Sequence, residues 1–108
     1  MTKTGGKADP AALTEIDRLV HEPARLAVMS LLFVVDRADF LFLMNQTGLT
    51  WGNLSAHMSR LEEAGYLTVE KTFKGKRPNT MLRLTPRGRD AFRTYAGRMR
   101  QYFSEIPE

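Results

Sequence analysis

The sequence predicts a single domain that is mainly α-helical and carries one small β-hairpin, an α+β fold. Three observations support this prediction. The chain has 108 residues, enough for one domain with a modest core. Apolar residues recur at helical spacing in several segments that begin with a capping residue or a proline. One later region instead alternates apolar and polar residues on both sides of a stretch containing Gly, Pro and Asn, which is typical of a hairpin.

The first three expected helices each have a starting signal. Asp9-Pro10 provides an N-cap followed by a proline at the first helical position, and helical spacing continues to Val20. Pro23 begins a second helix, residues 23–35, which is apolar almost all round and is therefore expected at the centre of the core. Residues 36–39 break this helix. Asp39 then caps a third helix over residues 40–47, which ends at Gly48.

The fourth expected helix covers residues 51–64, with Thr50 as its N-cap and Gly65 at its end. Its inner face consists of Leu54, Met58, Leu61 and Ala64. Only the three residues 48–50 separate it from the preceding helix. Two helices joined by so short a turn predict a helix-turn-helix, whose second member lies in the major groove of DNA.

The rest of the chain predicts a hairpin and a final helix. Residues 66–73 and 80–85 are the expected strands, with KGKRPN between them as the loop. Thr85-Pro86 opens a last helix over about residues 86–106. The order predicts a winged helix-turn-helix with added N- and C-terminal helices, forming one domain over residues 9–108. We expect residues 1–8 to be a disordered tail.

The outer face of helix 51–64 carries small, mostly uncharged side chains, where an ordinary solvent-facing helix carries Lys and Glu. Small residues allow close approach to base edges and phosphates, and a helix N-terminus favours phosphate. We therefore expect this recognition helix to contact DNA through Thr50, Gly52, Asn53, Ser55, Ser59 and Arg60. Ser55 and Ser59 could instead be indifferent surface residues. Trp51 could stack on a sugar or pack against a neighbouring element.

Positive charge is concentrated in the last third of the chain. The net charge is +4, but residues 71–100 hold ten Lys and Arg against Asp90 alone, a local net charge of +9. Such a concentration is typical of a polyanion-binding surface, although it also fits a solvated basic face. We expect Lys74, Lys76 and Arg77 of the wing, residues 71–80, to lie on the DNA backbone or in the minor groove.

The composition argues against several other functions. The chain has no cysteine and only two histidines, His21 and His57, which are too few for a zinc site. No nucleophile–base pair or Gly-rich phosphate loop is present, so we expect neither an enzyme nor a cofactor. We also expect no metal site, membrane span or signal peptide, and a cytoplasmic location. A protein–protein module that docks an acidic partner remains the alternative function.

The last helix carries an apolar seam of Phe92, Tyr95, Met99, Tyr102 and Ile106. The seam spans barely two heptads, whereas coiled coils usually sustain more. It could therefore pack within its own chain. The alternative, which we favour, pairs the terminal helices of two chains in a homodimer and places two recognition helices about 34 Å apart.

Residues 47–92, TGLTWGNLSAHMSRLEEAGYLTVEKTFKGKRPNTMLRLTPRGRDAF, resemble the core of winged-helix transcriptional regulators of the MarR/ArsR-like type. The shared pattern joins a GLT-x-GNLS-x-H recognition helix to a wing that ends in LT-x-x-GR. The segment HEPARLAVMSLL resembles the first core helix of these proteins, so the resemblance covers about residues 19–95.

The resemblance implies binding to double-stranded DNA through the helix and wing residues named above. It also implies a homodimer, because many relatives build one from added terminal helices. Trp51 departs from the pattern, since a small or acidic residue is expected there. Metal sensing is not implied, because the cysteine ligands of ArsR-type sensors are missing. The resemblance indicates no operator sequence and no effector.

Overall fold

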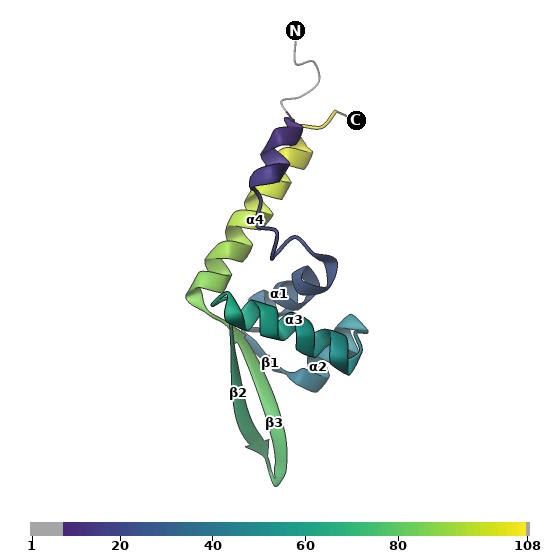
Figure 1. The fold of residues 1–108 in the computed structure, drawn as a ribbon, viewed down its shortest axis with the longest axis vertical. Helices are drawn as coiled ribbons and strands as arrows, with labels where there is room; N and C mark the ends of the chain where they lie inside the picture. The colour runs from purple at the N-terminus through teal and green to yellow at the C-terminus, as the bar shows by residue number, and fades with distance from the viewer. Residues whose placement is uncertain (1–7, 108) are drawn as a thin grey trace.

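The computed structural model describes residues 8–107, so the predicted tail of residues 1–8 lies, apart from Ala8, outside the described part. The elements follow the order η1 (Pro10–Glu15), α1 (Pro23–Val35), β1 (Arg37–Asp39), α2 (Phe40–Thr47), α3 (Trp51–Glu63), β2 (Leu67–Lys74), β3 (Arg77–Leu84) and α4 (Pro86–Ser104). The molecule is elongated, with extents of 66 × 24 × 21 Å. Figure 1 shows α4 and the β2–β3 hairpin leaving a compact group of helices at opposite ends of the long axis.

Side-chain caps start the helices at the predicted residues. The carboxylate of Asp39 accepts a hydrogen bond from the backbone N–H of Phe42 at 2.7 Å. The Thr50 hydroxyl oxygen accepts from the backbone N–H of Asn53 at 3.2 Å. Gly48 and Gly65 have φ values of 74° and 81°, the left-handed conformation that commonly ends a helix. The predicted ends of α2 and α3 are therefore confirmed to within one residue.

The prediction of a first helix extending to Val20 is wrong, because the regular segment is only the 3-10 helix η1. The Asp17 carboxylate accepts hydrogen bonds from the backbone N–H groups of Leu19 and Val20. Such local side-chain bonds compete with the helical pattern. Ile16 and Val20 are nevertheless buried in the core. The last helix also ends earlier than predicted, at Ser104 rather than residue 106.

The sheet has one strand more than predicted and a tighter hairpin. The segment expected only to break a helix forms β1, which pairs antiparallel with β3 and gives the strand order β1-β3-β2. The six-residue loop predicted at residues 74–79 is wrong. The strands extend until Lys74 pairs with Arg77, and only Gly75 and Lys76 form the turn. Gly75 has a φ of 67°, which glycine adopts without strain.

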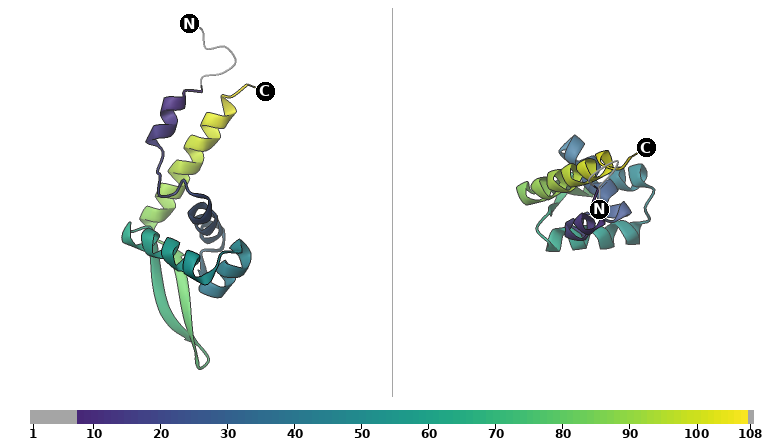
Figure 2. Two further views of the ribbon diagram at one scale, coloured as in Figure 1. Left: turned by 45° about the vertical axis from the view of Figure 1, so that its right-hand side comes forward. Right: turned by 90° about the horizontal axis from the view of Figure 1, so that it is seen from above.

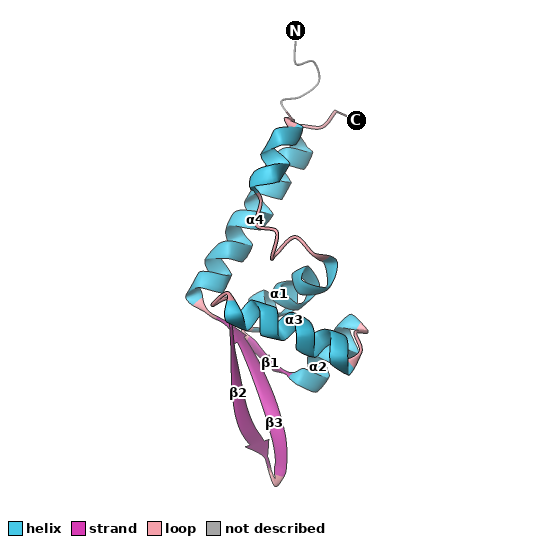
Figure 3. Ribbon diagram, in the orientation of Figure 1, coloured by secondary structure: helices cyan, strands magenta, loops and turns pink. Residues whose placement is uncertain are grey.

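The core lies where α1, α2 and α3 pack on one face of the sheet. Its fully buried side chains include Leu32 of α1, Leu43 of α2, Leu54 and Leu61 of α3, and Leu82 of β3. Figure 3 shows the three helices grouped above the base of the hairpin, whose tip projects beyond them. This arrangement confirms the predicted winged helix-turn-helix. Within residues 8–107, no helix is long and apolar enough to cross a membrane.

The N-terminal segment returns to the far end of α4. Figure 2 shows η1 beside the C-terminal half of this helix, well away from α3. The Arg98 guanidinium of α4 donates a hydrogen bond to the backbone carbonyl of Glu15 at 2.9 Å. The two segments form a narrow arm, residues 10–15 together with residues 95–104, that extends from the core.

Candidate nucleic-acid interface

The outer face of α3 is open to solvent and carries short side chains. Gly52, Asn53, Ser59 and Arg60 are exposed, and Ser55 is half-buried. The buried face of the same helix holds Leu54, Met58 and Leu61 against the core. The helix is thereby fixed by one face while the predicted DNA-contacting face remains free.

Trp51, at the start of α3, is 62% exposed, yet its ring lies on that of Phe40 with the centroids 4.3 Å apart. Aromatic pairs at this distance are stabilising. Trp51 thus packs against the start of α2, and its free surface lies beside the predicted DNA-contacting residues of α3. Of the two roles considered for Trp51, packing against a neighbouring element is confirmed.

A polar network ties the middle of α3 to the start of α1. Arg25, which is only 8% exposed, donates from Nε to the carbonyl of Leu19 at 2.7 Å, and its Nη1 lies 3.1 Å from Nδ1 of His57. The Glu22 carboxylate accepts from the backbone N–H of Arg25 at 2.8 Å. Burial alone would raise the pKa of Glu22. The bond from the Arg25 N–H and the nearby His57 and Arg25 side chains outweigh this effect, so the pKa is lowered. The network fixes the orientation of α3 relative to α1.

The wing carries four exposed cations near its tip, Lys71, Lys74, Lys76 and Arg77. Lys71 donates a hydrogen bond to the Thr80 hydroxyl at 3.3 Å. Lys74 lies 3.8 Å from the Asp39 carboxylate, but this lysine side chain is 77% exposed, so the pair is weak. The tight turn at Gly75 and Lys76 keeps these charges on a narrow ribbon.

Several other cations of the basic stretch are used within the fold. Arg83 and Arg89 both form ion pairs with Asp36, at 3.4 and 3.2 Å. Arg89 also lies near the carbonyls of Leu32 and Phe33 at the end of α1, where a cation is favoured by the helix dipole. On α4, Arg93 pairs with Asp90, and Arg98 binds the Glu15 carbonyl. Part of the local charge of +9 is therefore paired within the fold, whereas the wing brings four exposed cations together near the tip of one hairpin.

A family model described as a winged helix DNA-binding domain matches residues 24–103, from the start of α1 to the end of α4. The chain belongs to this family. Over 78 residues this winged helix is 31% identical to an uncharacterised protein of Methanocaldococcus jannaschii, a match that covers 72% of the chain and 85% of the relative.

Solved structures of other proteins share the winged-helix fold of this chain. The winged helix superposes with a TM-score of 0.82 on a transcriptional regulator homologue from Pyrococcus horikoshii OT3, with 26% identity, covering 87% of this chain and 95% of the other. A putative MarR-like transcription regulator from Bacillus cereus shares the fold, with a TM-score of 0.67, 16% identity and coverages of 88% and 70%. The predicted winged-helix fold is confirmed, and the family model and the Pyrococcus horikoshii regulator homologue support DNA-binding transcriptional regulation.

The predicted dimer seam of this winged helix does not lie on one free face. Tyr95 is buried within its own chain, where its hydroxyl lies 2.7 Å from Nδ1 of His21, so this residue does not belong in an interface. Phe92 stacks on Phe33 with ring centroids 5.0 Å apart. Ile106 lies beyond the end of α4 and is 42% exposed. Phe103, which was absent from the predicted seam, is 59% exposed on the same helix.

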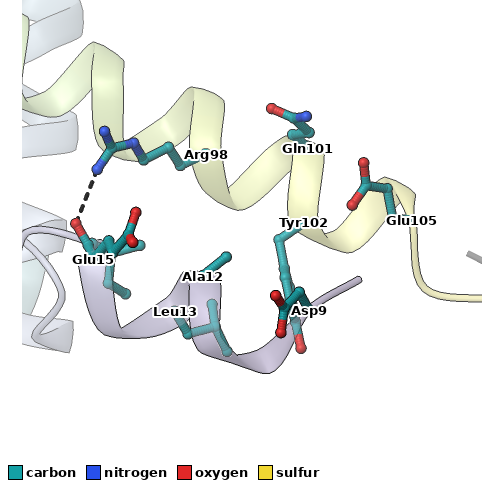
Figure 4. Close-up of a pocket in the computed structure, with 9 residues that line it drawn as sticks. Asp9, Ala12, Leu13, Glu15, Arg98, Gln101, Tyr102 and Glu105 are labelled. Carbon is teal, nitrogen blue, oxygen red and sulfur yellow. Dashed lines mark hydrogen bonds between the residues drawn. The ribbon is translucent and has the colours of Figure 1, made fainter. Parts of the chain in front are cut away.

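A pocket separates η1 from the end of α4 (Figure 4). Leu13 and Ile16 line one side of this cavity of about 190 Å³, and Arg98 and Tyr102 line the other. Figure 4 shows the Tyr102 side chain reaching from α4 across to η1. The two parts of the arm therefore touch through a few side chains and do not form a closed core.

The sequence did not predict the structural roles of two residues, Arg25 and Gly88. Arg25 is an isolated cation within an otherwise apolar run and is buried. A lone cation in such a run is the sequence feature that could have indicated a buried polar contact. Gly88 is buried in the first turn of α4, where an added Cβ atom would lie 2.1 Å from the carbonyl oxygen of Tyr66. Thr85 completes this junction by donating from its hydroxyl to the carbonyl of Gly65 at 2.6 Å. The end of α3 and the start of α4 are thereby held together.

Proposed function

We propose that this winged helix is a homodimeric transcriptional regulator that binds double-stranded DNA sequence-specifically. Its α3 lies in the major groove, and its wing contacts the backbone or the adjacent minor groove. One observation carries the proposal. The exposed small-residue face of α3 and the projecting cationic hairpin belong to the same winged core. This combination matches the docking geometry of helix-turn-helix proteins.

Within α3 we assign two kinds of contact. Asn53 and Arg60 are long enough to form hydrogen bonds with base edges, Asn favouring adenine and Arg favouring guanine. Thr50, Gly52, Ser55 and Ser59 allow close approach and contact the sugar-phosphate backbone. The Arg25–His57 contact supports both roles, since it fixes α3 at its middle. The residues that hold the helix are thus different from those that contact DNA.

The wing supplies most of the sequence-independent affinity. Lys74, Lys76 and Arg77 lie on a ribbon of two strands joined by a two-residue turn. Cations on so narrow an element can contact phosphates on both sides of a minor groove, which is about 6 Å wide. The loose pair between Lys74 and Asp39 costs little to break when a phosphate becomes available.

Dimerisation through the arm is supported by its poor packing within one chain. The last two turns of α4 leave Phe103 59% exposed and contact η1 only around a pocket. We propose that Met99, Tyr102 and Phe103 of the arm contribute to the interface, together with Phe92 just before the arm and Ile106 just beyond it. A two-fold dimer of this kind would bind an inverted repeat with half-sites about one helical turn apart.

A competition experiment tests DNA binding against the alternative of an acidic protein partner. Fluorescence anisotropy is measured with labelled random-sequence duplexes at low salt, in the presence of poly-glutamate at equal charge concentration. We expect duplex binding to persist, because the narrow wing and the free face of α3 fit a groove, and poly-glutamate offers only charge. If poly-glutamate displaces the duplex at equal charge concentration, the surface recognises acidic chains in general and the proposal is wrong.

Sedimentation of Phe103→Glu tests the dimer. A charge buried against an apolar partner face costs several kcal/mol, so the variant should be monomeric at micromolar concentration while wild type is dimeric. Val34→Glu is the matched control, because Val34 is 81% exposed and lies at the end of α1, away from the arm. A monomeric wild type, or equal dissociation in both variants, would show that the arm is not the interface.

A further inference from the structure

Phe73 is an unusually exposed aromatic residue near the tip of the wing. Its side chain is 73% exposed, against 62% for Trp51 and 59% for Phe103. Trp51 lies against Phe40, and Phe103 lies against Tyr102. In residues 8–107, Phe73 is the one aromatic side chain more than half exposed that has no ring partner. Covering this ring with a binding partner would remove apolar surface from water, which is favourable.

The strand register places Phe73 on the same face of the hairpin as the core. Successive strand residues alternate between faces, so Phe73 shares a face with the buried Leu67 at the base of β2. Its partner across the hairpin is Pro78, which shares that face with the buried Leu82. This face packs against α3 at the base of the hairpin, since Leu67 and Leu82 form one core with Leu54. Phe73 and Pro78 therefore continue the α3 side of the sheet beyond the end of the core.

The charges around this apolar pair indicate what covers it. Lys71, Lys74, Lys76 and Arg77 all lie within four residues of Phe73 along the hairpin. A partner must therefore combine dense negative charge with an apolar interior within reach of a single ring. The minor groove of DNA meets both requirements, because phosphates line its edges and the apolar faces of the stacked bases lie behind the base edges of its floor.

We propose that Phe73, supported by Pro78, is an apolar wedge that enters the minor groove and partly unstacks one base step. The wing cations hold the phosphates on either side while the ring inserts, and the duplex bends away from the wing. Apolar wedges of this kind kink DNA toward the major groove. The inference rests on the proposed DNA binding, but it adds a contact that neither the charge nor the recognition helix provides.

The test uses the full chain and duplexes carrying 2-aminopurine at successive positions across a site selected by the wild-type protein. Fluorescence of this base rises when it unstacks. We expect wild type to raise fluorescence at one step beside the α3 contact and to bend an end-labelled duplex. Phe73→Ala should lose both signals and bind on the order of tenfold more weakly. Its salt dependence should stay unchanged, because no phosphate contact is removed.

Phe73→Leu and Lys76→Ala serve as matched variants. Leucine keeps an apolar wedge and should retain the bend, whereas Lys76→Ala should keep the fluorescence signal and show a weaker salt dependence. Circular dichroism checks folding, which replacing an exposed side chain should not affect.

If the wild type binds DNA without unstacking, or if Phe73→Ala gives the same signal, the proposed wedge is wrong while DNA binding stands. If Phe73→Ala instead changes the oligomeric state, the ring contacts a second copy. If no duplex binds at all, both proposals fail.

Discussion

Replacing Lys76 and Arg77 with alanine should weaken the salt dependence of DNA binding by an amount that the structure sets. The wing presents four exposed cations, Lys71, Lys74, Lys76 and Arg77. If each neutralises one phosphate, the slope of log affinity against log salt is about −3.6 per protomer, or about −7 for a dimer. The double variant should have half that slope. Between 50 and 200 mM salt, wild type should lose about 10⁴-fold in affinity and the variant about 10²-fold.

The matched control removes two other arginines of the same basic stretch. Arg93 pairs with Asp90, and Arg98 binds the carbonyl of Glu15, both on α4 and remote from the wing. Arg93→Gln with Arg98→Gln changes the net charge by the same amount but should leave the slope unchanged. Fluorescence anisotropy titrations over a salt series measure both slopes. Equal reductions in the two variants would refute the assignment of phosphate contacts to the wing.

The remaining predictions concern the α3–α4 junction, tyrosine ionisation and base readout. Gly88→Ala should destabilise the fold by about 1–3 kcal/mol in urea unfolding, because its Cβ would meet the Tyr66 carbonyl, whereas Gly97→Ala in open space on α4 should not destabilise it. Burial and the bond to Asp17 raise the pKa of Tyr66 to about 12, so wild type should lose stability between about pH 10 and 12. This loss should be smaller in Tyr66→Phe, and an equal loss would contradict the cause given. Asn53→Ala and Arg60→Ala should each cost roughly 1–3 kcal/mol at particular base pairs only, so uniform losses across a mutated-site panel would exclude base readout by α3.

The parts of the fold that the sequence predicted are those determined by local chemistry. Asp39, Thr50 and Thr85 each accept a hydrogen bond from the backbone N–H three residues later, a relation visible in the spacing alone. Gly48 and Gly65 also end helices for a local reason, because both adopt the left-handed backbone conformation that glycine favours. The recognition helix and the start of α4 followed directly from these signals.

The features that the sequence did not predict depend on contacts between distant segments. β1 has three residues, too few for an alternating pattern, and exists because β3 pairs with it. Residues 74–79 contain Gly, Pro and Asn, yet the long hairpin register holds all but Gly75 and Lys76 in its strands. Tyr95 has the spacing of an interface residue, but its environment is set by His21, 74 positions earlier in the chain. The ion pairs of Arg83 and Arg89 with Asp36 were likewise invisible in a count of charges.

Selection of binding sites from a random duplex library tests the central claim most directly. Purified protein is incubated with the library at moderate salt, and the retained sequences are compared with those retained by Asn53→Ala and Arg60→Ala. We predict a single enriched motif, an inverted repeat with half-sites about one helical turn apart, in which each variant loses preference at different base pairs. Retention of sequences no different from the starting library, or a motif that both variants preserve, would contradict DNA recognition through α3.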